Sequence, residues 1–130
     1  KGGAWERVLV LSGTGTAGYL IETAPGDFDT VYLVDVGATS ILYSADAGQT
    51  RWYNRTATGT ILAFAAESKD VIYVGIASTV VKSLNSGFTW GMGTSPLGWS
   101  AAVSSIKVLS AGNVLIGNAA GQVGYSTDRI

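Results

Sequence analysis

The residues of this chain that are best spaced for chemistry are oxygen-bearing side chains in a short repeated stretch. The stretch occurs twice in full, with Ser, Asp or Asn, Gly and Thr at alternate positions before a Trp: Ser44, Asp46, Gly48, Thr50 and Trp52, then Ser83, Asn85, Gly87, Thr89 and Trp90. A third copy begins with Ser126 and Asp128. Asp and Asn side chains accept hydrogen bonds from nearby backbone N–H groups, and Gly permits a positive φ. The pattern therefore predicts tight loops held by internal hydrogen bonds.

The same oxygens could also suggest a calcium loop. Calcium takes about 6–8 oxygen ligands, usually including several carboxylates. Each stretch supplies one carboxylate at most, and the second has Asn85 in the place of Asp46. We therefore predict that both stretches are structural loops, and we expect no metal and no cofactor.

The composition is that of an apolar chain with few charges. Of the 130 residues, 47% are hydrophobic and 13% are charged, about half of the usual charged quarter. The formal net charge of −1, without a basic run, argues against nucleic acid as a partner. No apolar run approaches the ~20 residues of a membrane span, so no transmembrane segment is predicted. The chain has no Cys and no His, which removes the commonest general base.

Short apolar and β-branched runs alternate with turn signals along the whole chain, and no window has the apolar spacing of a helix. The predicted strands are Trp5–Leu11, Tyr19–Ala24, Thr30–Val36, Ile41–Ser44, Trp52–Thr56, Ile61–Ala66, Val71–Ile76, Val80–Ser83, Val103–Leu109, Val114–Gly117 and Val123–Ser126. The Ser of the repeat recurs after 39 and 43 residues, and Tyr32, Tyr73 and Leu115 recur after 41 and 42. A period of ~40–45 residues with four short strands per unit is the signature of a β-propeller blade.

We therefore predict an all-β fold of about three four-stranded antiparallel blades, roughly residues 12–56, 57–95 and 96–130. Trp5–Leu11 is predicted to be the last strand of a preceding blade, because residues 1–5 match the back half of the repeat, with Ala4 in the Thr place. Closed propellers have ~4–8 blades. We expect further blades from a longer polypeptide or from neighbouring subunits. Trp5–Leu11 should then pair with a third strand outside this chain, and Val123–Ser126 with a fourth.

The repeated stretch resembles the Asp-box, or BNR repeat, of sialidase-like β-propellers, whose pattern is Ser-x-Asp-x-Gly-x-Thr-Trp. The second copy matches with Asn85 in the Asp place, and the first matches with Arg51 inserted before Trp52. The resemblance implies that each box is a structural hairpin between the third and fourth strands of a blade. The family includes sialidases, xyloglucanases, sorting receptors, a photosystem assembly factor and many surface or phage proteins, so the fold leaves the function open.

A sialidase would need an arginine cluster, a Tyr–Glu nucleophile pair and an acid/base Asp, as the resemblance implies. The arginines here are Arg7, Arg51, Arg55 and Arg129, and all except Arg55 lie within or next to boxes, on the face that the family places opposite its catalytic centre. The family's Arg-Ile-Pro motif is missing. Glycoside hydrolysis needs two facing carboxylates, and the candidates Glu22, Asp35 and Glu67 are spread over two predicted blades with nothing to pair them. The segment has no recognisable catalytic constellation.

Two residues stand out as candidates for ligand binding. Asp35 lies inside an apolar strand, where we expect a hydrogen-bonded structural carboxylate near the central channel rather than a catalyst. Trp99 lies outside the boxes, in a Gly-rich connection, whereas Trp5, Trp52 and Trp90 are box tryptophans expected to pack between blades. The Asn54 triplet matches an N-glycosylation acceptor, which matters only in a secretory context.

The sequence thus favours a non-catalytic propeller module that acts as a structural or binding scaffold for a glycan or protein partner. The low charge, the absence of Cys and the abundance of small residues favour a cell surface or virion as its setting. The alternative is a set of non-catalytic blades from a glycoside hydrolase of the sialidase or xyloglucanase type.

Overall fold

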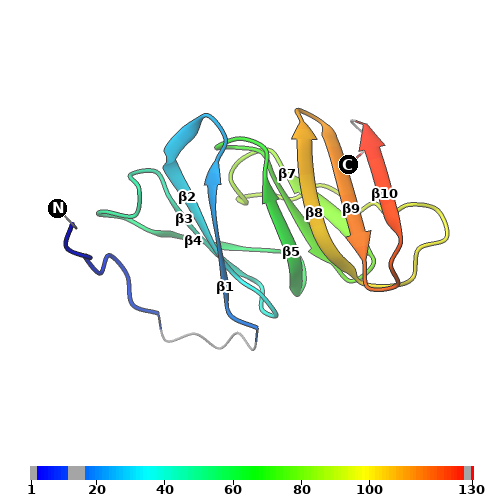
Figure 1. Ribbon diagram of the computed structural model, residues 1–130, viewed down its shortest axis with the longest axis horizontal. Helices are drawn as coiled ribbons and strands as arrows, with labels where there is room; N and C mark the ends of the chain where they lie inside the picture. Colours follow the sequence, from blue (N-terminus) through cyan, green and yellow to red (C-terminus); the bar gives the residue numbers. More distant parts are fainter. Residues whose placement is uncertain (1–2, 12–16, 128–129) are drawn as a thin grey trace.

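The computed structural model describes residues 3–11, 17–127 and 130, and within them the chain forms ten β-strands in three antiparallel sheets (Figure 1). Sheet A contains β1 (Tyr19–Ala24), β2 (Asp27–Asp35), β3 (Ser40–Ser44) and β4 (Tyr53–Thr56), in that order. Sheet B contains β5 (Ile61–Ala66), β6 (Ile72–Ile76) and β7 (Thr79–Ser83). Sheet C contains β8 (Val103–Ser110), β9 (Asn113–Asn118) and β10 (Val123–Thr127). The predicted all-β fold of antiparallel sheets is confirmed.

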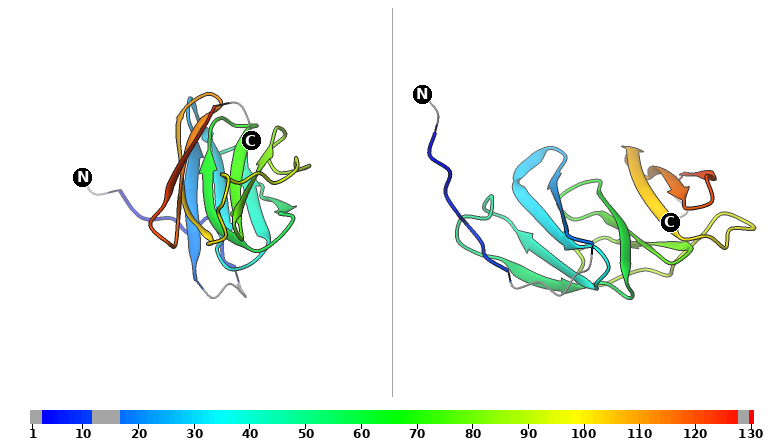
Figure 2. Two further views of the ribbon diagram at one scale, coloured as in Figure 1. Left: turned by 90° about the vertical axis from the view of Figure 1, so that its right-hand side faces the viewer. Right: turned by 60° about the horizontal axis from the view of Figure 1, so that its bottom comes forward.

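The three sheets stand side by side in chain order, so sheet B is covered on both faces (Figures 1 and 2). Successive side chains of a strand point to opposite faces, and each face of sheet B is apolar. One cluster fills the seam between sheets A and B, and its buried members are Tyr32, Val34, Ile41, Ala57, Ile61, Phe64, Ala66, Ile72, Val74 and Val81. A second cluster fills the seam between sheets B and C, with Ala63, Tyr73, Val80, Val103, Val114 and Ile116.

A tyrosine from a middle strand takes part in the hydrogen bonds that join neighbouring sheets at both seams, directly at one seam and through a glutamate at the other. The Tyr32 hydroxyl donates to the Lys69 carbonyl oxygen at 2.5 Å, which joins sheet A to sheet B. The Tyr73 hydroxyl donates to Glu67 Oε2 at 2.5 Å, and the same oxygen accepts from the Gly112 N–H at 2.9 Å, which joins sheet B to sheet C. Both tyrosines are fully buried, so each phenol would lack a water partner without these bonds.

The number of strands per sheet differs from the prediction. Sheet A has the predicted four strands, whereas sheets B and C have three among the described residues. Beside β7, the chain makes a single bridge between Val80 and Thr94, with two backbone hydrogen bonds of 2.7 and 2.9 Å, and the Gly91 N–H donates to the Lys82 carbonyl at 2.8 Å. The segment contains Gly91 and Gly93 and runs into Pro96. Glycine and proline disfavour a strand interior, so the fourth position of sheet B is filled without a regular strand.

The predicted strand Trp5–Leu11 is expected to pair with a strand outside this chain, so it stays a prediction. These residues form no strand, the Trp5 side chain is 102% exposed, and no backbone hydrogen bond joins them to another described residue. The β-branched composition is suited to a strand, but a strand needs a free edge to pair with, and β10 pairs only with β9 in the described part of the chain. The packing of Trp5 against a preceding blade likewise stays a prediction. Residues 7–11 instead cross the outer face of sheet A (Figure 2).

Several predicted features lie outside the described residues. They are the turn at residues 12–16, the first two residues, Asp128 of the third box and Arg129. Among the residues that are described, no helix is long and apolar enough to cross a membrane.

The buried Tyr32 phenol predicts a loss of stability at alkaline pH. Burial is the largest cause that raises its pKa from 10.0 to about 12. The folded state therefore favours the neutral phenol, and this contribution is complete below pH 10 and lost as the pH rises through about 12. We expect Tyr32→Phe to lower the free energy of unfolding by roughly 0.5–1.5 kcal/mol at pH 8 through the missing hydrogen bond, and to flatten the decline between pH 10 and 12.

Urea unfolding measured at a series of pH values checks this expectation. Tyr125→Phe is the matched control, because its hydroxyl also makes one hydrogen bond but its side chain is 60% exposed. Parallel pH curves for Tyr32→Phe and the unaltered protein would contradict the assignment.

Candidate functional site

The first box is a hairpin between β3 and β4 that is organised around one buried serine hydroxyl. Ser44 Oγ accepts from the N–H groups of Gly48 at 2.9 Å and Asp46 at 3.3 Å, and it donates to Asp46 Oδ1 at 2.6 Å. Asp46 Oδ2 then accepts from the Thr50 N–H at 3.0 Å and from the Thr50 hydroxyl. The Ser44 side chain thus accepts from backbone N–H groups in the first half of the loop, and the Asp46 side chain accepts from the backbone at its end, as the sequence pattern predicts.

The second box, which follows β7, repeats this network with an amide in place of the carboxylate. Ser83 Oγ accepts from the Gly87 N–H at 2.9 Å and donates to Asn85 Oδ1 at 3.0 Å. Asn85 Oδ1 also accepts from the Thr89 N–H at 2.8 Å. The last bond is reversed, because Asn85 Nδ2 donates to the Thr89 hydroxyl at 2.8 Å, whereas Asp46 accepts from its threonine. The amide therefore supports the same loop without a charge.

Both loops turn through two successive residues with positive φ. The angles are 55° and 77° at Ala47 and Gly48, and 56° and 81° at Ser86 and Gly87. A Cβ on Gly48 would lie 2.7 Å from Cζ2 of Trp52. Glycine is required there twice over, since both the backbone conformation and the close ring exclude a larger side chain.

Each box is also tied to the sheets around it. The Ala47 N–H donates to the Asp29 carbonyl at 2.7 Å, and the Ser86 N–H donates to the Asp70 carbonyl at 2.8 Å. The two tryptophans differ: Trp52 Nε1 donates to Gly48 O in its own loop at 3.2 Å, whereas the Trp90 indole crosses to sheet A and donates to Thr56 O at 2.9 Å. The second box therefore helps to close the seam between sheets A and B.

The carboxylate of Asp46 is stabilised in its ionised form. The hydrogen bond from Ser44 is the largest cause that lowers its pKa below 3.8, followed by the bond from the Thr50 hydroxyl. The polar atoms of the box that make these bonds are engaged with the loop itself. The arrangement is suited to fixing a hairpin, and no group of three or more metal-ligating side chains was found among the described residues.

The two candidate ligand residues lie in different parts of the structure, Asp35 in sheet A and Trp99 in the connection between sheets B and C, and do not form one site. Asp35 ends β2 and is 4% exposed, and its Oδ1 atom is buried without a hydrogen-bond partner in the described part of the chain. This differs from the expectation of a fully hydrogen-bonded carboxylate. Asn118 occupies the corresponding place in β9 and accepts from the N–H groups of Ala120 and Gln122 at 3.0 and 2.9 Å, which closes a turn. Trp99 is half-buried against the core cluster between sheets B and C.

The other titratable candidates are also separated. Arg55 lies over the rings of Tyr43, Tyr53 and Phe88 at 5.8, 5.6 and 5.5 Å from their centroids, so cation–π contacts hold it at the outer edge of sheet A. Arg7 lies over the opposite face of that sheet. Glu67 is engaged in the hydrogen bonds of the seam between sheets B and C. These side chains are held by local contacts at separate places.

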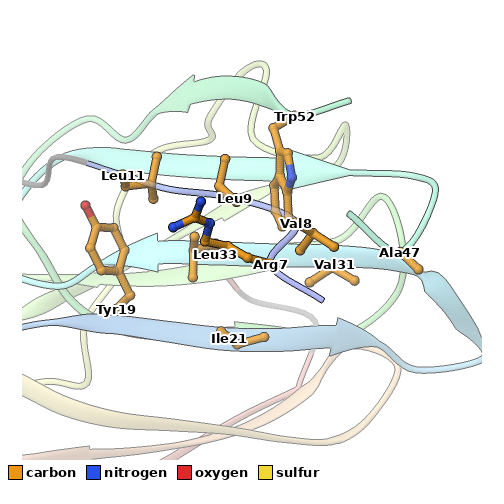
Figure 3. A pocket seen from close by; sticks show the side chains of 10 residues that line it. All are labelled: Arg7, Val8, Leu9, Leu11, Tyr19, Ile21, Val31, Leu33, Ala47 and Trp52. Carbon is orange, nitrogen blue, oxygen red and sulfur yellow. The ribbon is translucent and has the colours of Figure 1, made fainter. Parts of the chain in front are cut away.

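Sequence reasoning missed an apolar groove on the outer face of sheet A (Figure 3). The groove has a volume of about 450 Å³ and lies between the sheet and residues 7–11. Its lining consists of Arg7, Val8, Leu9, Leu11, Tyr19, Ile21, Val31, Leu33, Ala47 and Trp52. Part of the signal was present in the sequence, because Tyr19 and Ile21 are two positions apart in a predicted strand, so both side chains lie on the same face of the sheet.

The three sheets, their seams and their hairpins define a segment of a β-propeller, with each sheet as one blade. Two solved structures are similar to it. YCF48 from Cyanidioschyzon merolae superimposes with a TM-score of 0.71 at 17% identity, over 97% of this chain and 38% of its own. YCF48 bound to D1 peptide superimposes with a TM-score of 0.60 at 16% identity, over 76% of this chain and 34% of its own.

The chain thus spans little more than a third of the length of these two structures, and the likeness shows a shared fold. No protein-family model and no curated protein matches the sequence.

Asp46 predicts an acid-sensitive first box. Its folded-state pKa is lowered from 3.8, so its contribution to stability is present above pH 3.8 and lost as the pH falls through the lower, folded-state value. We expect Asp46→Asn to leave stability at pH 7 nearly unchanged and to remove this acid dependence, because Asn85 already supports the second box. Asp46→Ala should destabilise at pH 7. Thermal melts between pH 2 and 7 test this, and a melting temperature raised by Ca²⁺ and sensitive to Asp46→Asn would oppose a purely structural role.

Gly48→Val is expected to lower the free energy of unfolding by roughly 1–3 kcal/mol, because a β-branched residue is forced to a positive φ. The clash with Trp52 adds to this loss. Gly26→Val provides the control, since Gly26 has a similar φ of 80° but open space around its Cβ position. Equal losses for the two variants in chemical unfolding would show that the ring contact contributes nothing.

Proposed function

We propose that this chain is a non-catalytic module of an Asp-box β-propeller that serves as a scaffold for a protein partner. The membership in the Asp-box class is supported by the serine-centred hydrogen bonds of both hairpins, which use Ser, Asp or Asn, Gly and Thr in the same roles. The setting that we propose, a cell surface or virion, is supported by the low charge and the absence of Cys.

The observation that carries the binding role is the apolar groove on the outer face of sheet A. Its lining is apolar except for the guanidinium of Arg7 and the hydroxyl of Tyr19, since the indole N–H of Trp52 is already bonded to Gly48. A sugar presents hydroxyl groups that need several hydrogen-bond partners, and a groove without them leaves those groups unpaired. Apolar and aromatic side chains are instead typical of the core of protein interfaces. The solved structure of YCF48 bound to D1 peptide has a similar fold and holds a peptide, which supports a protein partner for this chain.

Binding and hydrolysis measured side by side test this proposal. We expect a library of displayed extended peptides to yield apolar binders, while an array of sialosides and glucans yields none. Ile21→Lys should abolish peptide binding, because Ile21 lies in the groove and is 70% exposed, so the change is tolerated by the fold.

Val10→Lys is the matched control for this experiment, since Val10 is 69% exposed and is not part of the groove. Cleavage of a fluorogenic sialoside or of xyloglucan by the protein would overturn the proposal in favour of a glycoside hydrolase. Glycan binding that survives Ile21→Lys would overturn the choice of a protein partner.

A further inference from the structure

The three sheets share one register, which identifies equivalent positions on them. Tyr32, Tyr73 and Leu115 lie in the middle strands, and each is paired with a residue of the following strand, namely Tyr43, Lys82 or Tyr125. The residues on either side of these three positions point to the opposite face of each sheet. Every sheet therefore has one face that contains the Tyr or Leu and one opposite face. At each of the two internal seams, the Tyr face of one sheet packs against the opposite face of the next sheet.

The opposite face is covered in sheets B and C and open in sheet A. In sheet B its members Ile72 and Val74 are 0% exposed, and in sheet C Val114 and Ile116 are 1% and 5% exposed. The equivalent pair in sheet A, Val31 and Leu33, is only half-buried and lines the groove in Figure 3. On the first strands the contrast is larger: Phe64 of sheet B is 4% exposed, whereas the equivalent Ile21 of sheet A is 70% exposed.

The face with the Tyr or Leu is covered in sheets A and B and open in sheet C. Ile41 and Val80 are both 0% exposed, while Val123 at the equivalent position is 74% exposed. Tyr125 on the same face is 60% exposed, and Leu115 is only half-buried. The two open faces of the chain are therefore the two halves of one further seam of the kind that already joins its sheets.

We propose that the open face of sheet A binds the open face of sheet C of a second copy of this chain. The interaction is head to tail and continues the two internal seams through equivalent positions. Two copies related by a two-fold axis would each give and receive one such face, which closes the assembly. The described residues of two copies bring six sheets together, within the ~4–8 blades of closed propellers, whereas those of three copies would bring nine. The proposal rests on the proposed function and names the partner of the same groove.

Residues 7–11 compete with the second copy for the face of sheet A. They lie over Val31 and Leu33 and make no backbone hydrogen bonds to described residues. Leu9 is half-buried, whereas Val8 and Val10 are 52% and 69% exposed. This cover is held by a few apolar contacts, and a sheet that makes contacts along all its strands displaces it.

The new seam is weaker than the two internal ones, because Leu115 stands where Tyr32 donates across its seam and where Tyr73 donates to a glutamate that bonds the next sheet. A leucine supplies apolar contact but no hydrogen bond. The pairing is therefore reversible and depends on protein concentration.

Sedimentation velocity over a range of concentrations tests the pairing with two variants on surface-exposed residues. Ile21→Lys places a charge on the open apolar face of sheet A, and Val123→Lys places one on the open apolar face of sheet C. We expect the unaltered chain to dimerise and each variant alone to remain a monomer, since every contact needs one face of each kind. An equimolar mixture of the two variants should dimerise again, because it contains one intact face of each kind.

Two further variants complete the experiment. Leu97→Lys, at a 104% exposed residue of the connection between sheets B and C, should leave the dimerisation constant unchanged. Leu9→Asp should lower the dissociation constant at least about threefold, because it removes the competing cover.

A chain that stays monomeric at all concentrations, or variants whose mixture stays monomeric, overturns the proposal and shows that something else covers the two faces. Selection of apolar peptides by a monomeric chain would leave the proposed function intact while this inference fails.

Discussion

The structure depends on one constraint: a small β-sheet that is apolar on both faces must be covered on both. Sheet B meets this constraint completely, with its two faces in separate clusters against sheets A and C. Because apolar burial is the main favourable term in folding, sheet B forms the centre of the chain. Each outer sheet buries its inner face against one face of sheet B. The apolar burial sets the positions of the sheets, and the hydrogen bonds of the hairpins, tyrosine hydroxyls and connections then fix how the sheets are aligned.

The hydrogen bonds give these seams a direction that apolar packing alone does not provide. Tyr32 reaches the first hairpin of the next sheet directly, whereas Tyr73 bonds Glu67 of its own sheet, which accepts from an N–H group in the first hairpin of the next sheet. The box hairpins bond back to Asp29 in β2 and to Asp70 in the turn before β6. These bonds link segments that lie 37 residues apart in one case and 45 in another. They select one register between neighbouring sheets, because a slip by one residue would bury the tyrosine hydroxyl without a partner.

Strands, period and box loops were predictable from the sequence because each depends on local chemistry. Alternating Ser, Asp and Gly can satisfy a loop within a few residues, and the network around Ser44 and Ser83 needs no distant partner. The strand predicted at residues 5–11 does not form within the chain, since its β-branched residues depend on an edge that the described chain does not offer. The groove on sheet A and the bonds through Glu67 were missed because they join residues whose proximity depends on how whole sheets pack. Asp35 and Trp99 were singled out one by one, and their separation follows from the same packing.

The two tyrosine contacts differ in what they require of the rest of the chain. Tyr32 donates to the main-chain carbonyl of Lys69, an atom that every amino acid carries. Tyr73 relies on the side chain of Glu67, which also holds the N–H of Gly112. We therefore expect most substitutions at position 69 to keep this hydrogen bond. Position 67 instead needs a side chain long enough to accept two hydrogen bonds at once, so the seam between sheets B and C depends on residue identity at a position where the seam between sheets A and B does not.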